Sequence, residues 1–185
     1  GPQAIIGGST TVECGDTVSI IRFENLSTDI FDTIVSWVWT IRTPDDTLTF
    51  SNVSPLELPL PVGVVGTAEL QVTSSNGCVS IATDTFTVPG IPNITLSTGP
   101  EVFDCHNAPV HIVVSGGQPN YTYVWTPMTG LTLDSIPPNV TANPSVTTTY
   151  QLIASDQICA DTVSVKIIRV TPIELSVEHE VIETC

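Results

Sequence analysis

The chain repeats itself along its length, and this periodicity constrains its fold more than any single motif. Three segments share a proline, a short β-prone run, an acidic residue and then a cysteine, at residues 2–14, 92–105 and 172–185. Their starts are 90 and then 80 residues apart. We therefore expect two full repeats, at residues 1–89 and 90–171. The segment 172–185 is expected to be the first strand of a third repeat, in a chain that belongs to a longer array.

Alternating runs rich in β-branched residues recur within each repeat and predict strands. Turn sequences such as Asn76-Gly77 and Gly116–Asn120 separate these runs. The expected strands are residues 18–23, 34–41, 68–73, 79–88, 111–115, 121–126, 147–154 and 162–170. About seven short strands per repeat are typical of an immunoglobulin-like fold. We predict an all-β chain of tandem immunoglobulin-like antiparallel β-sandwich repeats, in which Trp39 and Trp125 fill the two cores.

The charge balance excludes several classes of partner. The chain has 4 Lys+Arg against 19 Asp+Glu, for a net charge of −15. A chain this poor in basic residues cannot displace counterions from phosphates or bind anionic lipid surfaces, so we expect no nucleic-acid partner. No apolar run approaches the roughly 20 residues of a membrane span, so we expect no direct membrane insertion. The five cysteines favour an oxidising, extracellular compartment.

Several segments resemble known modules. Thr17–Ser27, Trp37–Trp39 and Asn76–Cys78 resemble PKD domains of Bacteroidota surface proteins. Ser115–Trp125 and Asn143–Tyr150 are similar to the SGGxPxYTYxW and NPxxTTTY segments of gliding-motility adhesin repeats. The resemblance covers nearly the whole chain. It implies PKD-like repeats in the stalk of a large exported protein at the bacterial cell surface, of the kind often carried by the type 9 secretion system.

The resemblance also implies a function, which is a structural stalk or adhesin segment acting in attachment or gliding motility. Its implied partners are neighbouring repeats, surface glycans and other cell-surface proteins. The alternatives are a glycan- or calcium-binding accessory module of a secreted protein and a subunit of an extracellular filament. The first repeat departs from the family pattern, because residues 42–61 lack the Asn-Pro approach to the next strand. The sequence therefore does not place strands within residues 42–61.

The cysteines occupy equivalent positions in the two repeats. Cys14 and Cys105 precede the second strand, whereas Cys78 and Cys159 begin the last one. In an immunoglobulin-like sandwich these two positions lie at opposite poles, and six-residue strands span about 20 Å. A disulfide requires Cα atoms within about 7 Å. In a head-to-tail array Cys14 would face Cys159 across the joint, and we predict that bond.

The remaining cysteines, Cys78, Cys105 and Cys185, would then await partners in adjacent repeats. The alternative is pairing within each repeat, as Cys14–Cys78 and Cys105–Cys159, which returns if the first or last strands are short.

Enzyme chemistry finds no support in the sequence. The histidines His106, His111 and His179 stand at no metal-ligand spacing, and no nucleophile elbow or phosphate-binding loop occurs. We therefore expect no catalytic activity, no catalytic residues and no resident cofactor. Calcium is the ion that would suit the acidic residues near turns and joints, which are Asp16, Asp45, Asp46, Glu101, Asp104, Asp156 and Asp161. Those residues form no DxDxD loop, and solvated turn carboxylates are the alternative.

Two further groups of residues are candidates for sugar chemistry. Trp37, Tyr121 and Tyr123 could stack on a glycan, although packing beside the core tryptophans is the alternative use of these rings. Five hydroxyl residues follow an aspartate and precede an aliphatic residue, in a pattern that resembles the O-glycosylation sequence of exported Bacteroidota proteins: Thr17, Thr33, Thr47, Ser135 and Thr162. The same pattern is also ordinary chemistry at the start of a strand.

Overall fold

The computed structural model describes residues 1–104 and 106–170. These residues form two compact units. Unit 1 comprises Gly1–Asn93 together with Ser155–Ala160, and unit 2 comprises Ile94–Ala154 and the described residues from Asp161 onward. The expected strand at 172–185 lies outside the described residues.

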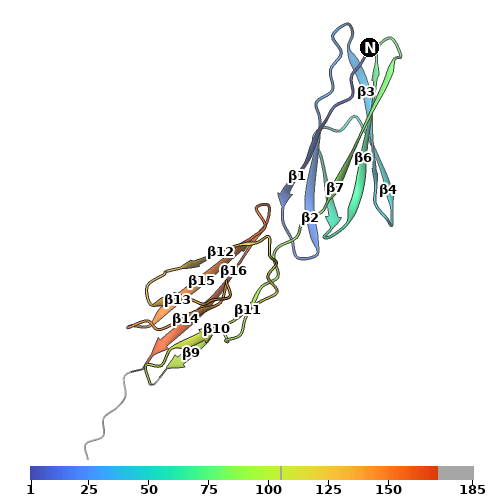
Figure 1. Ribbon diagram of the computed structural model, residues 1–185. Coiled ribbons are helices and arrows are strands. Elements are labelled where there is room, and N and C mark those ends of the chain that lie inside the picture. Colours follow the sequence, from blue (N-terminus) through green and yellow to red (C-terminus); the bar gives the residue numbers. More distant parts are fainter. Residues whose placement is uncertain (105, 171–185) are drawn as a thin grey trace, which may run out of the picture. The chain divides into compact units, whose positions relative to one another are not determined.

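Unit 1 is a sandwich of two antiparallel sheets (Figure 1). Its strands are β1 (Ile6–Glu13), β2 (Val18–Asn25), β3 (Ile34–Arg42), β4 (Thr47–Ser51), β5 (Leu56–Pro61), β6 (Val65–Ser74) and β7 (Val79–Thr87). One sheet has the order β1-β2-β5 and the other β4-β3-β6-β7. Because the chain crosses from one sheet to the other between β2 and β3, and again on either side of β5, the unit closes around a core shared by both sheets, as in immunoglobulin-like sandwiches.

The core of unit 1 follows from the alternation of apolar side chains along its strands. Ala68, Leu70 and Val72 of β6 all point inward and are at most 1% exposed. Trp39 is fully buried, as the sequence predicted, and it packs near Phe23, with 6.0 Å between the ring centroids. These side chains form a single apolar cluster contributed by both sheets.

Strands β4 and β5 lie in the segment 42–61, where the sequence pattern placed no strand. Strand β5 alternates strictly between buried and exposed residues, with Leu56, Leu58 and Leu60 facing the core. Its prolines, Pro59 and Pro61, are exposed. Proline is compatible with this strand because β5 pairs only with β2 and therefore lies at a sheet edge.

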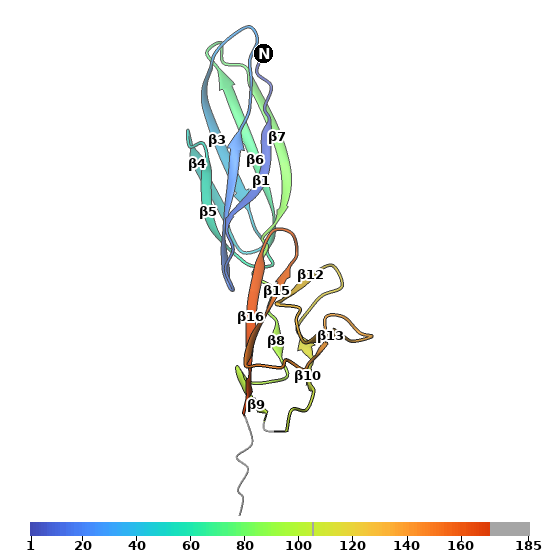
Figure 2. The same ribbon diagram turned by 90° about the vertical axis from the view of Figure 1, so that its left-hand side faces the viewer.

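Unit 2 is also all-β and can be followed in Figure 2. Its strands are β8 (Thr95–Leu96), β9 (Glu101–Asp104), β10 (Val110–Ile112), β11 (Val114–Ser115), β12 (Thr122–Thr126), β13 (Leu131–Leu133), β14 (Val140–Ala142), β15 (Thr148–Ser155) and β16 (Ala160–Arg169). The sheet orders are β12-β15-β16-β9, β10-β14-β13 and β11-β8. Trp125 is 5% exposed within the core, which also contains Tyr150 and Ile167 at 0%.

The first strand of unit 2 differs from that of unit 1. It is divided into β8, which pairs antiparallel with β11, and β9, which pairs parallel with β16. The β9–β16 pair is thus parallel, in a sandwich whose other described strand pairs are antiparallel. Pro100 lies between the two halves and has no backbone N–H, so no ladder hydrogen bond can be donated at this position. Its carbonyl instead accepts the amide of Lys166 at 2.9 Å.

A buried ion pair joins β9 to β16. Asp104 and Arg169 contact each other, and each side chain is 7% exposed. Asp104 Oδ1 also accepts the amides of His106 at 3.0 Å and Ala108 at 3.2 Å. The Arg169 guanidinium donates to the carbonyl of Pro144. The ionised groups are thus surrounded by hydrogen-bond partners, which a buried charge requires.

Candidate functional site: the disulfide-bonded turn

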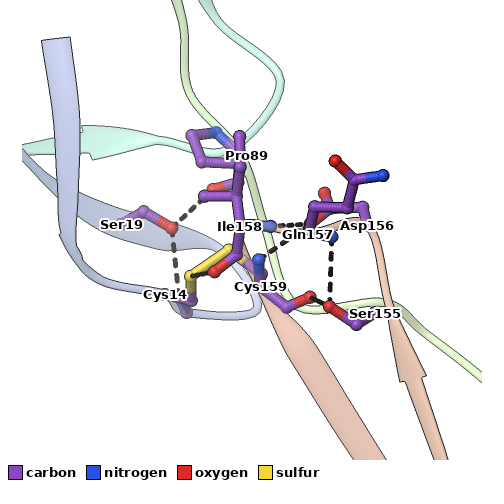
Figure 3. The surroundings of a disulfide bond; sticks show 9 residues. Cys14, Ser19, Pro89, Ser155, Asp156, Gln157, Ile158 and Cys159 are labelled. Carbon is purple, nitrogen blue, oxygen red and sulfur yellow. Dashed lines mark hydrogen bonds between the residues drawn. A yellow bond between two sulfur atoms is a disulfide. The ribbon is translucent and has the colours of Figure 1, made fainter. Parts of the chain in front are cut away.

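Cys14 and Cys159 form a disulfide although they are 145 residues apart in the sequence (Figure 3). Their Cα atoms are 5.8 Å apart, within the range of an ordinary disulfide. This is the pairing that the sequence predicted. Cys159 lies between β15 and β16, in the segment Ser155–Ala160 that is part of unit 1.

The loop that carries Cys14 is tied to the chain that leaves the sandwich. Gly15 donates its amide to the Ser19 hydroxyl at 3.1 Å, and that hydroxyl donates to the Pro89 carbonyl at 2.6 Å. The Gly15 carbonyl accepts the amide of Ile91 at 3.1 Å. A Cβ on Gly15 would stand 2.0 Å from the Val18 carbonyl oxygen, so glycine is required at this position. Hydrogen bonds therefore hold the loop that carries Cys14 in place.

The turn that carries Cys159 is held by its own polar side chains (Figure 3). The Ser155 hydroxyl donates to the Cys159 carbonyl at 3.0 Å. Asp156 Oδ1 accepts the amides of Ile158 at 2.9 Å and Cys159 at 2.7 Å. Gln157 takes a left-handed backbone conformation, with φ of 81°. Hydrogen bonds within each segment thus hold the backbone around both cysteines.

Unit 1 contains a second turn of closely similar construction, Ser74–Cys78, between β6 and β7. It has the same length as Ser155–Cys159, and the Ser74 hydroxyl lies 3.5 Å from the Cys78 carbonyl that it donates to. Its left-handed residue is Gly77, one position later than in the other turn. Cys78 is a free, exposed cysteine. The structure thus pairs one of the two equivalent turn cysteines and leaves the other accessible.

The Ser74–Cys78 turn is fastened to the loop that precedes β3. Asp32 accepts a hydrogen bond from the Ser75 hydroxyl and, at 3.0 Å, another from the Asn76 amide. The hydrogen bond from Ser75, followed by those from the backbone, holds the pKa of the Asp32 carboxyl below its usual value of 3.8. Gly1 also lies here, because a Cβ built on it would be 3.9 Å from Cys78 Cβ.

The aromatic candidates divide into packed rings and one that lies outside the core. The indole nitrogens of Trp37 and Trp39 both donate to the Val53 carbonyl, at 3.1 and 3.0 Å, and Trp37 packs against the core of unit 1. Tyr123 packs against the core of unit 2 and donates its hydroxyl to the Gln118 carbonyl at 3.2 Å. Tyr121 is only half-buried and lies outside both clusters of packed apolar residues.

Tyr121 and Tyr123 line a groove of about 470 Å³ in unit 2, together with the loop 116–119. Their ring centroids are 6.3 Å apart, with 50° between the ring planes. A Cβ on Gly117 would stand 2.1 Å from the Tyr123 hydroxyl, which explains the glycine in this loop. Of the three aromatic candidates, Tyr121 is the one whose ring the cores do not require.

Sequence reasoning missed one pair of titratable residues. His111 Nδ1 lies 3.0 Å from Asp134 Oδ2, and the Thr141 hydroxyl donates to Asp134 Oδ1 at 3.1 Å. His111 and Asp134 border a second groove of about 480 Å³ that also includes Ser135. The pair depends on the sheet register, which the sequence does not state. Thr141 of β14 lies opposite His111 of β10 on one side and opposite Thr132 of β13 on the other.

The acidic residues proposed for calcium do not converge among the described residues, where no group of three or more His, Cys, Asp or Glu side chains could hold a metal ion. Asp104 instead pairs with Arg169, and Asp156 accepts amides of its own turn. Asp46 and Asp161 each accept the amide of the next residue.

All five candidate glycosylation residues, Thr17, Thr33, Thr47, Ser135 and Thr162, are exposed. Thr33 precedes β3, and Thr162 lies early in β16. Two of the cysteines expected to have partners elsewhere, Cys105 and Cys185, lie outside the described residues. Within the part of the chain that the structure describes, no helix is long and apolar enough to cross a membrane.

No protein-family model matches the chain. No curated protein matches it either. Solved structures similar to it include the three N-terminal domains of the bacteriophage RB49 highly immunogenic outer capsid protein (Hoc), with 14% identity over 91% of this chain and a TM-score of 0.41. The chain spans 59% of the length of that structure.

Murine CEACAM1b is 14% identical, over 88% of this chain and 100% of that one, with a TM-score of 0.37. Immunoglobulin domains 1–5 of Sidekick-1 are 9% identical, over 90% of this chain and 39% of that one, with a TM-score of 0.35. The fold assignment itself rests on the strand order of each unit. The chain is an all-β protein built from tandem immunoglobulin-like β-sandwiches.

Proposed function

We propose that this chain is a structural segment of an extracellular bacterial surface protein, in which successive immunoglobulin-like repeats are joined by disulfides as well as by the peptide chain. The Cys14–Cys159 bond carries this proposal. It connects the loop after the first strand of one repeat to the last hairpin turn of the next, so it closes a covalent ring through both repeats.

The same linkage would continue toward a preceding repeat. Cys78 ends a turn closely similar to the one that Cys159 ends, and it is exposed beside Gly1. In an array, Cys78 would therefore bond to the cysteine equivalent to Cys14 in the preceding repeat. Cys105 and Cys185 would likewise bond to cysteines in later repeats.

The mechanical consequence follows from the covalent connectivity alone. Tension applied at Gly1 passes along the chain to Cys14, crosses the disulfide to Cys159 and continues into β16. Residues 15–158 lie inside the covalent ring and carry no tension through their backbone. Most strands of both sandwiches are thus shielded from unfolding by force, which is the property that a stalk holding a cell to a surface requires.

The extracellular setting is supported by the disulfide, since such bonds persist in oxidising compartments. The scarcity of basic residues, 4 Lys+Arg in 185 residues, leaves few sites for trypsin-like proteases. The role in attachment or gliding motility and the export route are inferred from the resemblance to adhesin repeats. The absence of catalysis is inferred from the lack of catalytic and metal-ligand motifs in the sequence.

The deciding experiment is peptide mapping by mass spectrometry, without reduction, on the parent protein isolated from its cells. We expect a Cys14–Cys159 crosslink and a second crosslink between Cys78 and a cysteine outside residues 1–185. Intact cells treated with protease should release peptides of these repeats into the medium. Crosslinks of Cys14 with Cys78 and of Cys105 with Cys159 would mean independent repeats and would contradict the proposal.

A second candidate function, glycan binding, is favoured by the groove beside Tyr121. A partly exposed ring next to Gln118 and free of charged neighbours in the lining suits an uncharged sugar. Calorimetric titration with neutral oligosaccharides tests it. Tyr121→Ala should abolish binding, whereas Val124→Ala, which alters an exposed residue of β12, should preserve it.

A further inference from the structure

The most exposed large apolar side chains of unit 1 stand side by side in the sequence. Ile30 is 82% exposed and Phe31 is 83% exposed, in the loop between β2 and β3. Single exposed apolar residues are ordinary on a protein surface, but two large ones that are adjacent in sequence and almost fully exposed concentrate apolar area in one loop. We call these two residues the apolar loop.

The apolar loop is fixed to the turn that carries Cys78. Asp32, the residue after Phe31, accepts hydrogen bonds from Ser75 and Asn76 of that turn. The carbonyl of Thr33 accepts the Ser75 amide at 2.9 Å. Val79, which follows Cys78, is 54% exposed. Figure 1 shows the loop before β3, the β6–β7 turn and the N-terminus at the same end of unit 1.

The opposite end of the unit is also apolar where it carries Cys14. Val12 and Val18 flank the Cys14 loop and are 51% and 46% exposed, and Val65 is 60% exposed. Strand register places Val18 and Val65 at the end of the unit opposite the β6–β7 turn, since Val18 pairs with Pro61 and Val65, the first residue of β6, pairs with Thr87. Each end of the unit therefore combines a cysteine on a pinned turn with uncovered apolar side chains.

Two different apolar ends on one unit suit a head-to-tail contact between successive domains rather than a symmetric dimer. We propose that the apolar loop is the docking surface for the preceding immunoglobulin-like domain of the array, whose Cys14-type loop seats against Ile30 and Phe31 and is thereby aligned with Cys78. The apolar contact positions the two sulfurs, and the disulfide then locks the domains. This inference rests on the proposed function and names the surface that performs it.

The occupant is a domain of the same array for two reasons. The Ser155–Cys159 turn is closely similar to the turn that carries Cys78. Within this chain it is bonded, through the Cys14–Cys159 disulfide, to the loop that carries Cys14. The surface around Cys78 also includes Gly1, so it lies where the preceding part of an array would reach unit 1.

The test uses the whole chain duplicated end to end, with residue 171 of the first copy followed by residue 2 of the second. This junction keeps the repeat frame, because Pro172 corresponds to Pro2. In the first copy, Cys78 is replaced by serine. In the second copy, Cys105 and Cys185 are replaced by serine. Cys78 of the second copy can then form its new disulfide with Cys105 of the first copy, and the effective concentration of these two thiols is measured by equilibration with glutathione.

We expect Ile30→Ser/Phe31→Ser in the second copy to lower that effective concentration by about tenfold or more. The matched control, Ile136→Ser/Val146→Ser in unit 2, changes two residues that are 72% and 67% exposed. This control should leave the effective concentration unchanged. If the crosslink forms equally well with and without the apolar loop, the docking surface is wrong while the disulfide-linked array stands.

Hydrogen exchange tests the docking surface separately from the disulfide-linked array. In a duplicated chain with Cys78→Ser in both copies, no disulfide can form at this turn, yet the Ile30 and Phe31 amides of the second copy should exchange more slowly than those of the single chain. Protection without any crosslink in the unsubstituted duplicate would support docking and contradict the disulfide-linked array. Equal exchange in both chains would overturn the docking surface.

Discussion

Cys78 stands in its hairpin turn where Cys159 stands in its own, four residues after a serine whose hydroxyl donates to the cysteine carbonyl. One of these two cysteines is bonded to Cys14 and the other is exposed. This correspondence is the reason to regard Cys78 as a linking residue rather than an incidental surface thiol.

The disulfide should control how far the chain extends under force. Pulled from its two ends without reductant, the chain should release none of the residues between Cys14 and Cys159. Cys14→Ser, or reduction, should add about 500 Å of extension, because the ring spans 145 residues at about 3.5 Å each. Single-molecule force spectroscopy measures this length. Cys78→Ser is the control and should extend like the natural chain.

The buried ion pair of unit 2 should be costly to break. Arg169→Met leaves the Asp104 carboxylate buried without its cation, so the free energy of unfolding should fall by about 3–5 kcal/mol. Urea unfolding measures the change. Arg42→Met is the matched control: Arg42 pairs with Glu69 at 3.5 Å, but its side chain is 48% exposed, so its loss should cost about 1 kcal/mol or less. Equal losses would mean that Asp104 is solvated in solution.

Gly66 should not tolerate a side chain. A Cβ at this position would lie 2.6 Å from the Arg42 carbonyl oxygen and 2.5 Å from Phe86 Cζ, and the oxygen belongs to the paired strand β3. We expect Gly66→Ala to destabilise unit 1 by about 1–3 kcal/mol. Gly99→Ala, where the nearest atom is 3.9 Å away, should change stability by about 0.5 kcal/mol or less. Thermal unfolding of both variants checks the contrast.

The turn that carries Cys78 should loosen in acid. Because the folded-state pKa of Asp32 lies below 3.8, its hydrogen bonds to Ser75 and Asn76 stabilise the turn above that pH. The contribution is lost as the pH falls through the lowered pKa. An NMR titration of the Asn76 amide should show a midpoint below 3.8. In Asp32→Asn the transition should disappear, and a midpoint at or above 3.8 in the natural chain would contradict the hydrogen bonds.

Much of the fold could be predicted from local pattern. The alternation of Ala68, Leu70 and Val72 has the period of a strand, and the tryptophans at equivalent places in the two repeats had to be buried. The Cys14–Cys159 pairing also followed from the repeat, since sandwich topology separates Cys14 from Cys78. These inferences depend on spacing along the chain, which the sequence states directly.

Other features depend on which strands become neighbours, and the sequence carries no local signal for that. Strand β5 contains two exposed prolines and is a strand only because the edge of a sheet leaves their positions free. Strand β9 pairs parallel with β16, an arrangement set by the whole sheet. The contact of His111 with Asp134 and the exposure of Ile30 and Phe31 likewise exist only once the loops are placed. The sequence by itself determined the repeat, the strand periodicity and the position of each thiol. The tertiary structure decided sheet order, edge strands and which apolar side chains stay uncovered, because these depend on contacts between residues that are distant in the chain.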